Sequence, residues 1–109
     1  MNEMAFGVSR QELNDWKERV RRGEIAYLTH YWLEPRWPGI TTVTKVGCSD
    51  LQKLTAWCRE HGLNPKYIHQ RQPYPHYDLI GLKQMAILKQ EQLWDQIERF
   101  KLLEQTPPF

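Results

Sequence analysis

The chain has 109 residues, of which 40% are hydrophobic and 26% are charged, and these proportions are typical of one folded globular domain. The net charge of +2 is too small to indicate a dedicated nucleic-acid-binding protein, because such proteins concentrate basic residues on one face. No apolar run approaches the roughly 20 residues that span a bilayer. Cys48 and Cys58 predict reduced thiols rather than a disulfide scaffold. We therefore expect a cytoplasmic protein with no membrane association and a single domain over residues 1–109, with a flexible lead at 1–8 and a frayed tail at 104–109.

The first helix is predicted at residues 9–22. Ser9 followed by Glu12 is the pattern of a capping box. Trp16 and Val20 recur at helical spacing, and a glycine follows where a helix commonly ends.

Two strands are predicted next. Segment 24–33 is rich in β-forming residues and is largely apolar on both of its alternating faces, which favours a central or near-central strand. A loop with two prolines at 34–39 leads to the β-branched segment 40–48, which is predicted as the second strand.

A second helix is predicted to open at Ser49, with Gln52 at the capping-box position, and to end at Gly62. A short strand at 67–69, a strand in the stretch that follows and a last helix at 82–103 complete the pattern. The last helix is expected to turn the following residues inward: Met85, Leu88, Leu93, Ile97 and Phe100. The order, α-β-β-α-β-(β)-α, predicts a small α/β or α+β domain, in which a three- or four-stranded sheet is packed by about three helices.

Several short motifs, in their order along the chain, resemble a bacterial and phage family, the domain of unknown function numbered 4031. They are RWPG at 36–39, SDLQKL at 49–54, HGLNPKYIHQ at 61–70 and PHYDL at 75–79. The whole chain, including its first helix, is similar in greater detail to the YneQ-like proteins of bacilli. One departure is that TTVTKVG stands where the first family has a histidine in the strand before the second helix. The resemblance implies a fold and the place of a site, and no activity.

The most site-like stretch is RQPYPHYDLIG, at 71–81. In a strand, His76 and Asp78 lie on one face and Tyr77 on the other. A carboxylate beside an imidazole raises its pKa and fixes its orientation, as a general acid or base requires. His76 and Asp78 are therefore the candidate catalytic residues.

Other residues are candidates for binding a small anionic ligand of the nucleotide type. Guanidinium groups clamp anions, and an exposed indole offers a stacking platform. The remaining histidines and a tyrosine are candidates because they lie near the box in the sequence or in neighbouring strands. The candidate binding residues are Arg71, His69, Tyr74, His30, Arg36 and Trp37.

A structural interpretation stands beside each of these. Asp78 can cap a turn or the last helix while His76 bonds a backbone carbonyl, and the prolines on either side of Tyr74 can simply stiffen the loop. His30 can be a core histidine with one hydrogen bond. The RWPG segment can be a plain loop.

No metal and no cofactor are expected. Cys58 and His61 are three residues apart, and Cys48 and His69 could join them, but the tight paired spacing of zinc sites is absent. Cys58 also falls on the apolar stripe of its helix, which favours a buried inert thiol. No glycine-rich phosphate loop or nucleophile elbow is present.

Three functional hypotheses stay open at this point, and the sequence leaves open whether the protein is an enzyme. The first is a small-molecule enzyme in which His76 transfers a proton, Asp78 orients it and Arg71 binds an anion. The second is a non-catalytic interaction module, for example a homodimer that buries Trp32, Trp37 or Trp94. The third, a weak nucleic-acid binder, has the least support.

Overall fold

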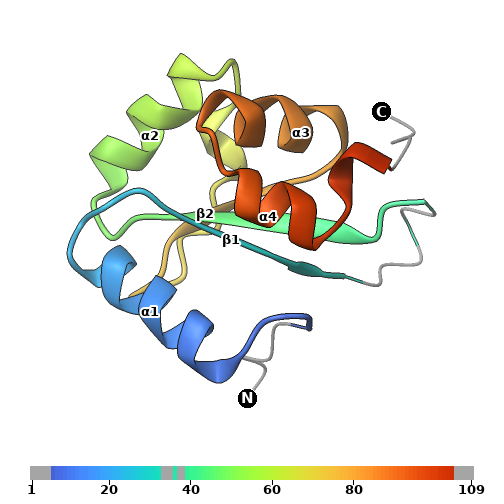
Figure 1. The fold of residues 1–109 in the computed structure, drawn as a ribbon. Helices are drawn as coiled ribbons and strands as arrows, with labels where there is room; N and C mark the ends of the chain where they lie inside the picture. The colour runs from blue at the N-terminus through green and yellow to red at the C-terminus, as the bar shows by residue number, and fades with distance from the viewer. Residues whose placement is uncertain (1–5, 33–35, 37–38, 105–109) are drawn as a thin grey trace. The chain divides into compact units, whose positions relative to one another are not determined.

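The structure, a computed structural model, describes residues 6–32, 36 and 39–104. In chain order the elements are α1 (Arg10–Arg21), β1 (Ala26–Tyr31), β2 (Thr42–Gly47), α2 (Leu51–Glu60), β3 (His76–Leu79), α3 (Gly81–Gln90) and α4 (Trp94–Arg99), with short 3-10 helices at Pro65–Tyr67 and Leu102–Glu104 (Figure 1). The strands form an antiparallel sheet in the order β1-β2-β3. The predicted mixed α/β class is confirmed.

The contacts within the chain group its residues into two units. The α1–α2 unit comprises Ser9–Leu28 and Lys45–Asp78, and the α3–α4 unit comprises Thr29–Thr44, the residues from Leu79 onward and those before Ser9. Within the described ranges, no helix is both long enough and apolar enough to cross a bilayer. The predicted flexible lead and frayed tail fall largely outside those ranges.

The first helix begins where the sequence predicts. The Ser9 hydroxyl accepts a hydrogen bond from the Glu12 amide at 3.1 Å, and the Glu12 carboxylate accepts one from the Ser9 amide at 2.7 Å, which completes the capping box. Trp16 and Val20 are buried. At Gly47 of β2 an added Cβ would lie 2.5 Å from the Trp16 ring, so glycine is what lets α1 pack this close to the strand.

In the α1–α2 unit the two helices cover opposite faces of the strands (Figure 1). The indole of Trp16, from α1, donates to the Ala26 carbonyl at 3.0 Å. The indole of Trp57, from α2, donates to the Tyr27 hydroxyl at 2.8 Å. Because successive side chains of a strand alternate between faces, each indole fixes one side of β1.

Two local predictions in this unit are wrong. The cap of α2 is Asp50 rather than Ser49: its carboxylate accepts from the Lys53 amide, while the Ser49 hydroxyl donates to the Arg21 carbonyl at 3.3 Å. The predicted strand at 67–69 is a 3-10 turn at Pro65–Tyr67 followed by a single bridge residue. Asn64 caps that turn, and Pro65 suits its first position because it lacks the amide that would be left without a partner.

In the α3–α4 unit, β1 is an edge strand, and the prediction of a central position is wrong. The apolar faces of β1 suggested a central strand, but its outer edge is covered by contacts with residues outside the sheet. The Tyr31 amide donates to the Phe6 carbonyl at 2.8 Å. The Thr29 amide and hydroxyl both donate to the side-chain oxygen of Gln96, at 3.0 and 2.6 Å. These contacts use the polar groups that an edge strand would otherwise present to another chain.

The predicted single helix at 82–103 is broken into α3, α4 and the terminal 3-10 turn. Gln92 and Lys101 adopt left-handed conformations, with φ of 59° and 54°, and each interrupts the helical run. Of the residues predicted to face inward, Leu88, Ile97 and Phe100 are buried, while the other two, Met85 and Leu93, are half-buried.

We predict that Gln96→Ala lowers the free energy of unfolding by about 1–3 kcal/mol, because it leaves the buried Thr29 without its acceptor. Urea unfolding followed by circular dichroism measures the loss. Gln90→Ala, on the exposed last turn of α3, is the matched control. Equal stability of the two variants would contradict the role given to Gln96.

Candidate functional site

A β-hairpin in the α1–α2 unit places the predicted site residues. His69 and His76 face each other across it, with the His69 amide donating to the His76 carbonyl at 2.8 Å and the His76 amide donating to the His69 carbonyl at 3.0 Å. Residues opposite each other in an antiparallel pair direct their side chains to the same face. The two imidazole rings accordingly stack, with centroids 5.0 Å apart and planes 21° from parallel.

The loop of this hairpin is held at both ends. The Tyr74 amide donates to the Arg71 carbonyl at 3.0 Å, which closes a turn, and the Cys48 amide donates to the carbonyl of the buried Pro75 at 3.1 Å. At the other end Ile68 is buried. The pairing of the two histidines therefore does not depend on their own side chains.

Asp78 lies on the same face as both histidines. Strand alternation carries it there, two residues beyond His76. Its Oδ2 is 3.3 Å from Nε2 of His69, and its Oδ1 is 3.7 Å from Nε2 of His76. One ligand atom from each of the three residues lies within 4.8 Å of the other two. We call this surface, with Lys45 of the neighbouring strand, the hairpin face.

The orientation of the His76 ring is set by the backbone. Its Nδ1 lies 3.0 Å from the Tyr74 carbonyl oxygen. A carbonyl only accepts hydrogen bonds, so Nδ1 carries the proton in this contact, and in the neutral ring Nε2 presents its lone pair to Asp78. Among the residues that the structure describes, none donates a hydrogen bond to the buried Oδ1 of Asp78. Two acceptors therefore face each other.

The three side chains differ in their access to solvent. The side chain of His69 is 59% exposed and that of Asp78 is 35% exposed, whereas that of His76 is only 16% exposed. Burial lowers the pKa of His76 below its ordinary value, against the opposing effects of the Tyr74 carbonyl and Asp78. The neutral form of His76 is therefore favoured near pH 7.

Two cationic side chains of α1 contact the ring of Tyr74, and the charge of Lys45 acts on Lys17 and on His76. Arg21 of α1 donates to the Tyr74 hydroxyl at 2.5 Å, and its Cζ is 5.7 Å from the ring centroid. Lys17 Nζ is 5.4 Å from the same centroid. Burial lowers the pKa of Lys17, and the charges of Lys45 and Arg21 lower it further. Lys45 also acts on His76 in the same direction.

The opposite face of β3 is packed rather than polar. The ring of Tyr77 lies 6.4 Å from that of Trp57 on α2. Burial raises the pKa of Tyr77, and the nearby Cys58 raises it further. The His-Tyr-Asp box is thus divided, with His76 and Asp78 on one side and the packed Tyr77 on the other.

The remaining predicted residues do not all join this site. Arg71 is exposed in the hairpin turn. His30 belongs to the α3–α4 unit, where its Nδ1 lies 2.9 Å from the Tyr31 carbonyl oxygen. Arg36 is exposed, and Trp37 lies outside the described residues. Sequence reasoning missed Lys17, Arg21 and Lys45, because nothing in their local pattern indicates that α1 lies beside Tyr74 or that the charge of Lys45 acts on His76.

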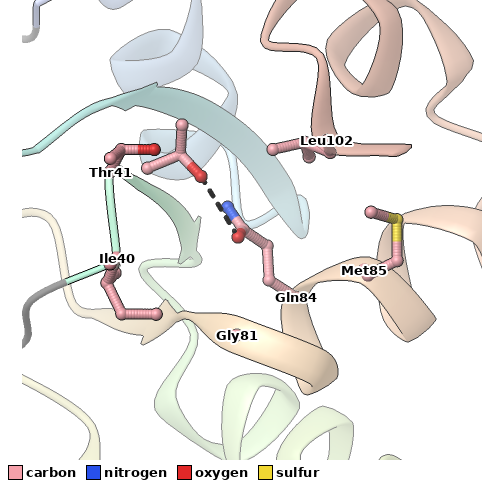
Figure 2. Close-up of a pocket in the computed structure, with 8 residues that line it drawn as sticks. Ile40, Thr41, Gly81, Gln84, Met85 and Leu102 are labelled. Atoms are coloured by element: carbon pink, nitrogen blue, oxygen red, sulfur yellow. Dashed lines mark hydrogen bonds between the residues drawn. The ribbon is translucent and has the colours of Figure 1, made fainter. Parts of the chain in front are cut away.

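A cavity in the α3–α4 unit offers no comparable site. Figure 2 shows Gln84 reaching across it from α3, and its side-chain oxygen accepts a hydrogen bond from Thr42 at 3.3 Å. The volume is about 10 Å³, which is about the minimum for one water molecule. Its lining residues are Gly39, Ile40, Thr41, Thr42, Gly81, Gln84, Met85 and Leu102.

The thiols weighed in the sequence as metal ligands are buried and free. Cys48 donates to the Gly23 carbonyl at 3.4 Å. Burial raises the pKa of Cys48, and it raises that of Cys58 to about 11. The ring of His61 lies against that of Trp57, with centroids 4.7 Å apart and planes tilted by 50°. None of these three residues belongs to the group of metal-ligand type found among the described residues, which consists of His69, His76 and Asp78.

Comparison with known proteins gives one informative match. The chain is 54% identical over 99 residues to a protein of Bacillus subtilis (strain 168) that carries the name "Uncharacterized protein YneQ". The match covers 91% of this chain and 100% of that protein. No family model matches the chain, and no solved structure matches it.

We predict that Cys48 and Cys58 resist iodoacetamide in the folded protein at about pH 8, because only the thiolate reacts and burial disfavours it. Mass spectrometry of the intact chain measures the labelling, and the same reaction in guanidinium chloride is the control in which both thiols react. Rapid labelling of the folded protein at either cysteine would contradict the burial described above.

Proposed function

The chain belongs to the YneQ family, and from the geometry of the hairpin face and of the cations beside it we propose that it binds a small anionic ligand there. The observation that carries this proposal is the contact of Lys17 and Arg21 with Tyr74, together with the charge of Lys45, which acts on Lys17 and His76. The acid–base roles predicted for His76 and Asp78, and with them the enzymatic hypothesis, stay predictions.

The proposal rests on the positive charges of these cationic side chains and on the size of the group that they can contact. Like charges held close together raise each other's free energy; burial lowers the pKa of Lys17, and the charges of Lys45 and Arg21 lower it further. A bound anion relieves that repulsion, and the Tyr74 hydroxyl and the exposed His69 lie within the same unit to contribute polar contacts. The cluster is small, so it suits a phosphate-sized group better than a nucleic-acid backbone, which needs a long basic surface.

We also propose that the YneQ family is a branch of the domain of unknown function 4031 family, on the strength of the RWPG, SDLQKL and PHYDL motifs. A cytoplasmic location is proposed on a separate basis. The two cysteines are free thiols, and free thiols suit a reducing compartment.

The interaction-module hypothesis keeps one specific observation in its favour. In the α3–α4 unit Phe6 and Tyr31 form an antiparallel bridge at the sheet edge, and both side chains are exposed, that of Phe6 by 62%. Of the aromatics named for a dimer interface, Trp94 is 47% exposed and Trp32 is half-buried.

If a homodimer buries these aromatics, sedimentation velocity should show a concentration-dependent shift to twice the monomer mass, and Phe6→Ser should abolish that shift. A monomer throughout the micromolar to millimolar range would remove this hypothesis.

The anion-binding proposal is tested with inorganic phosphate and pyrophosphate, on protein freed of metals by a chelating resin. Saturable shifts of the Tyr74 and His76 backbone amides are expected in two-dimensional NMR spectra. Lys45→Gln should weaken binding by about tenfold or more, because a hydrogen bond to a charged group contributes about 1.5–3 kcal/mol. Lys89→Gln, on the exposed last turn of α3, is the matched control. If Lys45→Gln and Lys89→Gln bind pyrophosphate as the unchanged protein does, the proposal fails.

A further inference from the structure

We infer that His69, His76 and Asp78 bind one divalent transition-metal ion of the zinc class. This inference deepens the proposed function and rests on it in one respect: the anionic ligand held by the cations beside Tyr74 would also contact the ion. It departs from the sequence-based expectation of no metal, which had weighed Cys48, Cys58, His61 and His69.

The spacing of the three side chains suits a common ion. Zinc–nitrogen and zinc–oxygen bonds of about 2.0–2.2 Å place neighbouring ligand atoms of a tetrahedral site about 3.3–3.6 Å apart. Oδ2 of Asp78 is 3.3 Å from Nε2 of His69, and Oδ1 is 3.7 Å from Nε2 of His76. One ligand atom from each residue lies within 4.8 Å of the other two, so side-chain rotations that draw these atoms closer would complete the set around one ion.

The hydrogen bond from His76 to the Tyr74 carbonyl has the form that metal-bound histidines use. Such a histidine donates its second ring N–H to a carboxylate or a backbone carbonyl, which fixes the tautomer and turns the other nitrogen to the ion. Here Nδ1 has that backbone partner at 3.0 Å, and Nε2 is the nitrogen directed to Asp78. The ring is therefore held in the ligating orientation before any ion arrives.

Asp78 supplies an independent reason to expect an ion at this position. Its Oδ1 is buried, and within the described part of the chain it lacks a hydrogen-bond donor. A buried carboxylate oxygen without compensation is costly. Across from it lies the Nε2 lone pair of His76, a second acceptor, so the gap between them favours a positively charged group. An ion satisfies both atoms at once, and Asp78 can also reach His69 through its other oxygen.

The ligand set also indicates which ions bind. Two imidazoles and one carboxylate suit zinc, iron, cobalt or nickel, whereas calcium and magnesium prefer oxygen ligands. Three protein ligands leave coordination positions open, as in catalytic rather than structural zinc sites. The exposed side chain of His69 gives those positions access to solvent.

Titration of the tag-free, metal-depleted full chain with Zn²⁺ in a phosphate-free buffer tests the inference by calorimetry. One ion per chain is expected. His69→Ala, which changes an exposed side chain, and Asp78→Asn, which keeps the shape, should each weaken binding by more than about 100-fold, since even partners outside the ligand set change affinity by about 10–100-fold. His61→Ala is the matched control and should bind as the unchanged protein does. Thermal unfolding of each variant without metal verifies that it folds.

Co²⁺ gives a second readout. Its visible absorption should rise to one equivalent without a thiolate charge-transfer band, and it should be lost in His69→Ala and Asp78→Asn. No saturable binding of either ion, binding that is unchanged in both variants, or a thiolate band would each overturn the inference. Phosphate binding by metal-free protein would then still support the proposed function. Conversely, the protein could bind Zn²⁺ and yet bind neither phosphate nor pyrophosphate, whether or not the ion is present. That result would contradict the proposed function and would leave the metal site standing.

Discussion

The reciprocal pair of backbone hydrogen bonds between His69 and His76 sets the positions of His69, His76 and Asp78 relative to one another. Because side chains alternate along a strand, a shift of this pairing by one residue would turn His69 to the other face and separate it from Asp78. The register is protected by groups outside the site. Ile68 is buried on one arm, and on the other the Pro75 carbonyl accepts from the Cys48 amide. The three polar side chains thus depend on a backbone arrangement that none of them has to stabilise.

That arrangement has a cost on the hairpin face and a benefit on the opposite face. A buried polar atom without a partner costs about 1–3 kcal/mol, and Oδ1 of Asp78 is such an atom among the described residues. Across the strand, Tyr77 packs beside Trp57, whose indole is hydrogen-bonded to Tyr27. A ligand site on a small scaffold needs an apolar face that holds the strand in place. It also needs a polar face whose groups are not all hydrogen-bonded within the chain. The hydrogen bond from Nδ1 of His76 to Tyr74 supports the same interpretation, because it leaves Nε2 available.

The sequence predicts best where the interactions are local. The Ser9 capping box and the shared face of His76 and Asp78 follow from spacing alone, and both are seen in the structure. The same reasoning fails where a residue contacts another that lies far away in the sequence. Gln96, far along the chain, covers the edge of β1, and its distance hides the edge position of that strand. The left-handed residue Gln92 interrupts the predicted last helix, and no glycine or proline in the sequence indicates this break. Lys17 and Arg21 of α1 contact Tyr74 from far along the chain, so no local motif marks them.

The central claim is that the ring of His76 is held with Nδ1 protonated and Nε2 free for a ligand. Long-range proton–nitrogen NMR correlation of the imidazole side chains, on metal-free protein near neutral pH, tests it directly, because the two nitrogens of a neutral ring have distinct shifts. The account predicts that the nitrogen with the protonated shift is Nδ1 and that Nε2 carries the lone pair. A ring protonated at Nε2 and donating to Asp78 would contradict the account, since the carboxylate would then be satisfied within the chain.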